Sequence, residues 1–163
     1  MNQTSIHHPF VERFSEASTT PAPQITEAHL DLMEREFRVF LPSAYREFAL
    51  RHGAVRTPSI LHVTVDNDID LADLHHFTEG DQLIDAARVC WKGGMSQKMI
   101  PFASDCMGNL FCFRRTAIQA KPHADSPIWF FDHDFGTEEQ IADGFDAWLA
   151  HFLTLPTSAE TPS

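Results

Sequence analysis

Apolar residues recur every three or four positions in two neighbouring stretches of the chain, residues 26–37 and 42–52. This spacing places them on one face of a helix, so each stretch is predicted to form an amphipathic helix. Thr26 is suited to cap the first helix, and Pro42 suits the first turn of the second. Gly53 follows the second stretch, where a glycine commonly ends a helix. The two helices are therefore predicted to form a short antiparallel pair.

Four later segments have the pattern of β-strands. Residues 60–65 are rich in β-branched side chains, while residues 99–103, 110–113 and 128–132 are short apolar runs. A Gly-Asn pair at positions 108–109 separates the second run from the third and predicts a tight hairpin turn. We expect these segments to build a mainly antiparallel sheet.

Helical spacing returns in two places. Residues 83–89 are predicted to form a short helix between the first two strands. Near the C-terminus, Thr137 and Gln140 have the spacing of a capping box, which predicts a helix over residues 138–152. The apolar face of this helix consists of Ile141, Phe145, Trp148, Leu149 and Phe152.

The order of these elements predicts an α+β fold, in which an antiparallel β-sheet is flanked by an N-terminal helix pair and a C-terminal helix. A chain of 163 residues has the length of one domain. Residues 1–23, rich in Ser, Thr and Pro towards their end, are predicted to be a flexible N-terminal extension, in which the pattern allows a short helix around residues 10–14. Residues 24–153 are predicted to form the single α+β domain, and residues 154–163 a disordered tail.

The net charge of the chain limits the kinds of partner that it can bind. There are 23 Asp and Glu residues against 12 Lys and Arg, which gives a net charge of -11. This excess of acid speaks against binding to nucleic acid or to an anionic membrane. The acids concentrate in residues 61–86 and 132–163, and neither block contains a Lys or Arg. Two interpretations stay open: the acids keep the protein soluble, or they form a face that recognises a basic partner.

The second interpretation names candidate residues. One group of acids follows the segment 60–65, and the other comes at the end of the segment 128–132. If the strands place both groups at one end of the sheet, their charges add into a single anionic surface. The predicted partner-binding residues are Asp66, Asp68, Asp70, Asp73, Asp132 and Asp134.

The residue types used in catalysis are present without the spacings that catalysis needs. Cys90, Cys106 and Cys112 fit neither a disulfide framework nor a zinc site, and His75 and His76 are adjacent, so they point to different sides of a strand or helix. The sequence contains no GxSxG, HExxH or phosphate-loop motif. We therefore predict no catalytic residues, no metal site and no cofactor. An N-terminus without an apolar run, together with unpaired cysteines, predicts a cytoplasmic protein.

Four segments resemble, in order, the motifs of the SUKH superfamily, also called the Smi/Knr-like domain. They are LPSAYREFALRHG at residues 41–53, IPFASDCMGN at residues 100–109, PIWFFDHD at residues 127–134 and FDAWL at residues 145–149. The resemblance covers roughly residues 25–153 and implies the fold of that superfamily together with a non-catalytic role.

Members of the superfamily are mostly immunity proteins, which bind and neutralise a toxin, commonly a nuclease delivered between competing bacteria. The resemblance therefore implies a cognate protein toxin as the partner, and a basic nuclease domain would suit the acidic surface. Two alternatives stay open: an interaction or scaffold module with an unrelated partner, and a small hydrolase. The oligomeric state does not follow from the sequence.

Overall fold

Five β-strands form one antiparallel sheet in the order β1-β2-β3-β4-β5, so each strand pairs with the next along the chain. The structure, a computed structural model, describes residues 5–15, 21–122 and 124–156. The strands are β1 His76–Phe77, β2 Met99–Ser104, β3 Leu110–Arg114, β4 Ile128–Asp132 and β5 Thr137–Ala142. The described helices are α1 His7–Phe14, α2 Glu27–Phe37, α3 Ser43–His52, α4 Pro58–Asp66, α5 Leu83–Lys92, α6 Arg115–Ala120 and α7 Phe145–Leu153, with the 3-10 helix η1 Gly80–Gln82. The predicted α+β fold class is confirmed.

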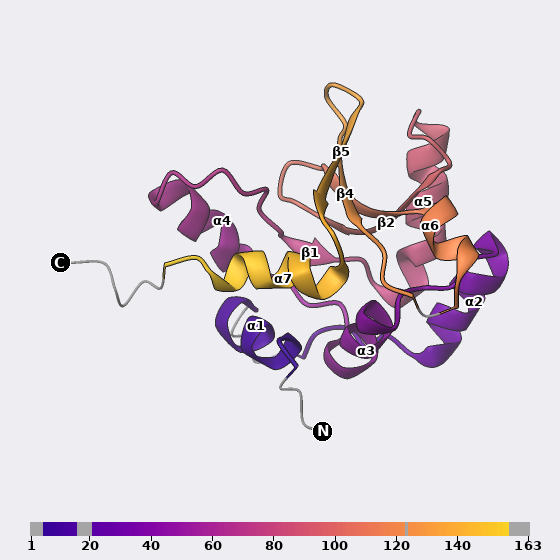
Figure 1. Cartoon of the computed structure of the whole chain (residues 1–163), viewed down its shortest axis with the longest axis horizontal. Helices are drawn as coiled ribbons and strands as arrows, with labels where there is room; N and C mark the ends of the chain where they lie inside the picture. The colour runs from indigo at the N-terminus through magenta and orange to yellow at the C-terminus, as the bar shows by residue number, and fades with distance from the viewer. Residues whose placement is uncertain (1–4, 16–20, 123, 157–163) are drawn as a thin grey trace.

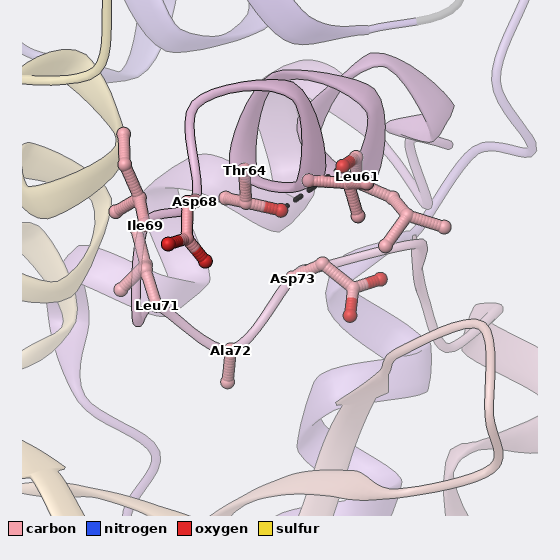
Figure 2. Close-up of a pocket in the computed structure, with 8 residues that line it drawn as sticks. Leu61, Thr64, Asp68, Ile69, Leu71, Ala72 and Asp73 are labelled. Carbon is pink, nitrogen blue, oxygen red and sulfur yellow. Dashed lines mark hydrogen bonds between the residues drawn. The ribbon is translucent and has the colours of Figure 1, made fainter.

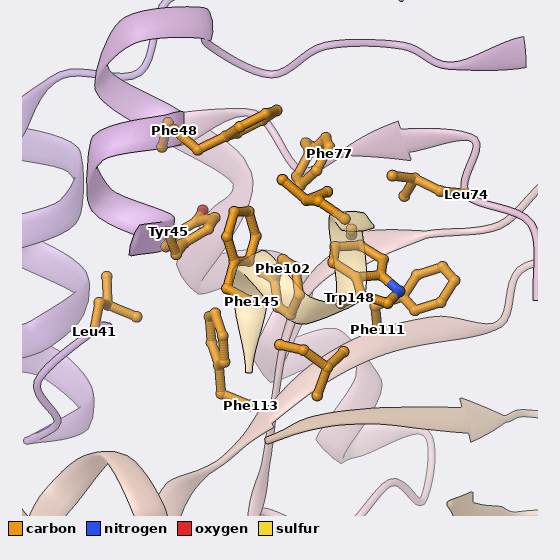
Figure 3. Packing of buried hydrophobic residues seen from close by; sticks show 14 of the residues in the cluster. Leu41, Tyr45, Phe48, Leu74, Phe77, Phe102, Phe111, Phe113, Phe145 and Trp148 are labelled. Carbon is orange, nitrogen blue, oxygen red and sulfur yellow. The ribbon is translucent and has the colours of Figure 1, made fainter. Parts of the chain in front are cut away.

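The main core lies between one face of the sheet and helices α3 and α7 (Figure 3). Trp148 of α7 is fully buried, and its ring centroid lies 4.9 Å from that of Phe111 on β3. The ring centroid of Tyr45 on α3 lies 5.4 Å from that of Phe113. The Phe113 ring stacks on the Phe102 ring, with 4.3 Å between their centroids. These aromatic contacts join the two helices to adjacent strands in one packed layer.

A smaller apolar cluster occupies the opposite face of the sheet. Met95, Met99 and Cys112 are buried there, and Trp91 of α5 packs against them. The indole Nε1 of Trp91 donates a hydrogen bond to the carbonyl oxygen of Met99 at 2.8 Å. Burial raises the pKa of the Cys112 thiol well above its ordinary value, which keeps this thiol protonated at neutral pH.

Helices α2 and α3 confirm the predicted N-terminal pair. Thr26 Oγ1 accepts a hydrogen bond from the backbone N–H of His29, and His29 Nδ1 accepts one from the backbone N–H of Thr26. This reciprocal cap uses a histidine where Glu or Gln is usual. Gly53 ends α3 with φ at 74°, at a point where an added Cβ would lie 2.5 Å from the carbonyl oxygen of Pro23. The structure likewise confirms the predicted strands at residues 99–103, 110–113 and 128–132. It also confirms the predicted helix at residues 83–89.

The first helix, α1, belongs to the core. Phe10 and Phe14 are buried, and their ring centroids lie 5.9 and 6.4 Å from that of Phe152 on α7. The prediction of a flexible extension over residues 1–23 is therefore wrong for this helix, because its two phenylalanines cover an apolar side of α7. Figure 1 shows α1 directly beside α7. Residues 1–4 and 16–20 of that prediction lie outside the described residues.

The two ends of the described chain are held together by polar contacts. The Arg13 guanidinium donates from Nη2 to the carbonyl oxygens of Leu155 and Pro156, at 2.5 and 2.7 Å. His7 Nε2 lies 2.7 Å from Asp146 Oδ1. Leu155 is buried, so the predicted disordered tail does not begin at residue 154, while its residues 157–163 lie outside the described chain.

Residues 60–65 lie within helix α4, so the prediction of a strand there is wrong. Pro58 stands in the first helical turn, where its fixed φ suits a helix. Ile60 and Thr64, one helical turn apart, are both buried, whereas Val65 is exposed. The β-branched side chains favour a strand locally, but β1 occupies the place beside β2 at the sheet edge. Burial of one helical face therefore outweighs local strand propensity.

The first part of the predicted helix 138–152 is instead the strand β5, which pairs with β4. Helix α7 begins only at Phe145, after Gly144. Its first N–H is satisfied from outside the helix, because Asp125 Oδ1 accepts a hydrogen bond from the backbone N–H of Phe145 at 3.2 Å. The predicted apolar face is confirmed from Phe145 onward, while Ile141 lies on β5 and is half-buried.

Candidate functional site

The acidic segment, residues 66–73, connects α4 to β1 on the surface (Figure 1). Asp66, Asp68 and Asp70 are exposed, while Asp73 is half-buried. These are four of the six acids that the sequence predicts to bind a partner. The segment offers three carboxylates to solvent within a few residues, so it concentrates negative charge at one place on the surface.

Hydrogen bonds hold the acidic segment at both ends. The N–H of Ile69 donates to the carbonyl oxygen of Thr64 in the last turns of α4, at 3.0 Å. Asp68 adopts the left-handed backbone conformation, with φ at 51°, which turns the chain back after the helix. At the other end, the buried Thr57 hydroxyl donates to the carbonyl oxygen of Leu74 at 2.7 Å. The carboxylates are therefore carried by an anchored loop.

A hollow of about 390 Å³ lies between the acidic segment and α4. Figure 2 shows the segment curving beneath the helix, with Asp68 and Asp73 on its two arms and Thr64 above. The hollow combines apolar walls with two carboxylates, an arrangement that suits a Lys or Arg side chain with its aliphatic stem. The lining residues are Leu61, Thr64, Val65, Asp68, Ile69, Leu71, Ala72 and Asp73.

A second hollow, of about 610 Å³, lies on the other side of the acidic segment, towards β5 and α7. Asp70 shares this hollow with Glu139 of β5 and His151 of α7. Its apolar lining comes from residues 69–72 and from Phe130 and Ile141. No Lys or Arg among the described residues lines either hollow. The negative charges of Asp70 and Glu139 therefore add in this hollow, where His151 is the basic residue among the described lining residues.

Asp73 carries an electrostatic cost in the folded protein. Burial, followed by the negative charge of Asp105, raises the pKa of the Asp73 carboxyl, and hydrogen bonding from Cys106 opposes the shift. Its Oδ2 atom is buried and has no hydrogen-bond partner within the part of the chain that the structure describes. A buried acceptor without a partner disfavours the folded state, so the ionised Asp73 carboxyl lowers the stability of the protein.

Asp132 and Asp134 lie elsewhere: Asp132 is the last residue of β4, and Asp134 lies in the turn between β4 and β5. This turn stands at the top of Figure 1, while α4 and the acidic segment lie at the left. Asp132 Oδ1 accepts hydrogen bonds from the backbone N–H groups of Asp134 and Phe135, at 2.9 and 3.2 Å. Asp132 therefore shapes the turn, whereas the Asp134 carboxylate faces solvent. A role for either in binding stays a prediction.

The acid that joins Asp70 in the structure is thus Glu139, which the sequence analysis did not single out. The predicted helix over residues 138–152 placed Glu139 in its first turn, whereas the residue lies on the strand β5. Two signals favour the observed strand: the Asp-Phe-Gly run at residues 134–136 is typical of a turn, and the Asp-Gly pair at residues 143–144 separates β5 from α7.

Two further features bear on the type of protein. Across residues 5–15, 21–122 and 124–156, no three His, Cys, Asp or Glu side chains gather closely enough to hold a metal ion. Within the same ranges, no helix has the combination of length and hydropathy that crossing a bilayer requires.

The chain is an α+β protein whose antiparallel meander carries helices on its faces and an acidic loop on its surface. The sequence profile of the SMI1 / KNR4 family (SUKH-1) matches residues 24–151. The chain belongs to this family, which confirms the resemblance found in its motifs.

A solved structure supports the fold independently. The chain is similar to the crystal structure of a protein from Pseudomonas syringae pv. tomato, with a TM-score of 0.54 and 16% sequence identity. The match covers 91% of this chain and 96% of that one. A search of curated protein sequences gave no match. At this identity the likeness shows a shared fold and says nothing of a shared partner.

Proposed function

We propose that this chain is a non-catalytic binding protein, an immunity protein that neutralises a cognate bacterial toxin. Membership of the SUKH-1 family is the observation that carries this proposal. The contact is made in part by the acids predicted from the sequence, Asp66, Asp68, Asp70, Asp73, Asp132 and Asp134.

Electrostatics favours a basic toxin domain as the partner. A nuclease holds its substrate through phosphate contacts and therefore carries Lys and Arg on its substrate face. The acidic segment and Glu139 present carboxylates along two hollows, and none of the described residues that line these hollows is a Lys or Arg. Such a surface attracts a basic domain over a distance of about one Debye length, ~8 Å at physiological salt. The attraction raises the rate of association. The bound chain then competes with nucleic acid for the basic face of the toxin domain.

The raised pKa of Asp73 supports a role in binding over a role in folding. A protein under selection for stability alone gains by replacing a half-buried, incompletely paired carboxylate. Functional sites are where such destabilising groups are retained, because the partner supplies the missing interaction. A Lys or Arg entering the hollow beside Asp73 would offset the cost of its burial.

The decisive experiment begins by sequencing the genes that neighbour the gene for this chain in its native host, and by expressing any toxin domain that they encode. The purified chain should form a complex with that domain, measured by isothermal titration calorimetry, and should protect cells that express it. Failure to bind and to protect would refute the proposal.

A charge-reversed pair tests the acidic segment within that complex. Asp68→Lys with Asp70→Lys should slow association by about tenfold or more at low salt and weaken its salt dependence. Glu47→Lys with Asp85→Lys is the matched control, because it changes the net charge equally at exposed positions on α3 and α5. Equal association rates for the two double variants would remove the acidic segment from the contact.

A further inference from the structure

The turn between β4 and β5 presents an aromatic side chain to solvent. Phe135 keeps 81% of its surface exposed, more than any other large apolar side chain of the described chain. Most phenylalanines in this protein are in the core, where their burial stabilises the fold. Phe135 contributes no such burial, so the folded chain by itself gives no reason for an aromatic residue at this position.

The backbone on either side of Phe135 is held in one conformation. Asp132 Oδ1 accepts a hydrogen bond from the N–H of Phe135, and the Asp132 carbonyl oxygen accepts one from the N–H of Gly136 at 2.7 Å. Gly136 adopts a positive φ of 66°, which closes the turn. Phe135 therefore projects from an ordered turn, so that little backbone entropy is lost when a partner binds it.

A second exposed side chain, Met107, belongs to the neighbouring turn between β2 and β3, where it keeps 67% of its surface exposed. The two turns are joined by hydrogen bonds. The backbone N–H of His133 donates to Asn109 Oδ1 at 3.1 Å, and His133 Nε2 lies 2.7 Å from the carbonyl oxygen of Met107. Asp105 in turn accepts hydrogen bonds from the N–H groups of Met107 and Asn109, at 2.8 Å each. The pair of turns forms a single support for both exposed side chains.

The charges around this support are mainly negative. Asp134 is exposed beside Phe135, and Glu138 and Glu139 follow on β5. Arg114 pairs with Glu138 at 3.1 Å and lies over the Trp129 ring, on the face of the sheet. Residues 132–163 contain no Lys or Arg. A partner for the turns must therefore offer an apolar pocket bordered by basic side chains.

We propose that the hairpin-tip surface, made of Met107, His133, Asp134 and Phe135, is a docking site for the basic toxin domain, with Phe135 inserted into an apolar pocket of that domain. This inference rests on the proposed function and names the anchor of its contact. An aromatic residue on an ordered support, ringed by charges that guide approach, has the properties of a binding hot spot. The acidic segment then governs the rate of approach, and Phe135 governs the lifetime of the complex.

The test measures the Kd between the chain and the toxin domain identified among the neighbouring gene products. Phe135→Ala should weaken binding by about 30-fold or more, mostly through faster dissociation, as hot-spot truncations do. Phe135→Trp should retain most of the affinity, because it preserves an aromatic anchor. Val89→Ala, at an exposed apolar position on α5, is the matched control and should bind like the parent chain. All three variants should unfold at the temperature of the parent, since neither position is buried.

Three results would overturn the inference. If Phe135→Ala binds the toxin domain as tightly as the parent chain, the hairpin-tip surface is not the docking site, while the proposed function stands. If the parent chain does not bind the toxin domain, the proposed function and the docking site are both refuted. If sedimentation shows that the parent chain self-associates and that Phe135→Ala abolishes this without changing toxin affinity, the surface binds a second copy of this chain instead.

Discussion

Replacement of Trp148 by alanine tests the packing of α7 on the sheet most directly. Trp148 is fully buried, and its ring lies among aromatic rings from three strands and from its own helix. The nearest centroids belong to Phe111 at 4.9 Å and Phe102 at 5.5 Å, and the second of these contacts is edge-on. Neither ring can fill the space of an indole without leaving its own strand position.

The size of the effect follows from the area that the indole buries. A tryptophan buries about 150–250 Å², which at about 25 cal/mol per Å² corresponds to roughly 4–6 kcal/mol. Measured Trp→Ala changes in cores cost about 3–5 kcal/mol, so we expect Trp148→Ala to lose an amount in that range. The total stability of a domain is about 5–15 kcal/mol, so this variant should remain folded but lose a large part of its margin.

A second variant separates packing from polarity. Trp148 Nε1 is buried and has no hydrogen-bond partner among the residues that the structure describes. Trp148→Phe removes this unpaired donor together with part of the ring, so the two effects oppose each other. We expect Trp148→Phe to cost less than about 2 kcal/mol, well below Trp148→Ala.

The assay is urea unfolding followed by far-ultraviolet circular dichroism, because a fluorescence signal would lose one of its sources in each variant. Val65→Ala, at an exposed position on α4, is the control and should change the free energy of unfolding by less than about 0.5 kcal/mol. A loss below about 1 kcal/mol for Trp148→Ala would refute the packing argument. Equal losses for Trp148→Ala and Trp148→Phe would also contradict it, because phenylalanine retains most of the ring packing that alanine removes.

Three further predictions concern other parts of the chain. The folded-state pKa of Asp73 is raised above its ordinary value of 3.8, so ionisation of this carboxyl lowers the stability of the fold as the pH rises above that value. Asp73→Asn, which cannot ionise, should therefore stabilise the protein against urea at pH 7. The gain should fade below about pH 4, where the carboxyl is protonated in both the folded and the unfolded state. A gain independent of pH would contradict this assignment. Gly53→Ala places a side chain against the Pro23 carbonyl at a backbone conformation reserved for glycine, so it should cost at least about 1–3 kcal/mol and lower the melting temperature. An unchanged melting temperature would be inconsistent with this geometry. Elemental analysis of tag-free protein should find no transition metal in stoichiometric amount, and a metal-to-protein ratio near one would contradict the sequence argument.

The fold was predictable where local signals and tertiary packing agree. Thr26 and Gly53 mark real helix ends, and the Gly-Asn pair at 108–109 sits in a real hairpin turn. Local signals fail where pairing with a neighbouring strand outweighs them. Thr137 and Gln140 have capping-box spacing, yet this stretch pairs with β4 as the strand β5. Residues 60–65 likewise lie in a helix although they are rich in β-branched side chains.

The candidate site was predictable in composition and only partly in position. The acids at 66–73 lie together on one anchored loop because they are contiguous in sequence. Their neighbour Glu139 could not be found without the strand assignment, since β5 brings it beside Asp70. Asp132 could not be recognised as a turn-forming residue, because its contacts depend on backbone N–H groups whose direction a sequence does not specify.

The contact between α1 and α7 has a consequence for how the chain folds. Arg13 reaches the carbonyl oxygen of Leu155 across 142 positions of sequence, and Phe10 packs on Phe152 over the same span. Contacts of such high sequence separation slow folding, because a long loop must close before they form. During synthesis, the apolar face of α1 emerges from the ribosome before its binding surface on α7 exists. We therefore expect the core to close in one late step, with α1 docking only after α7 has been made.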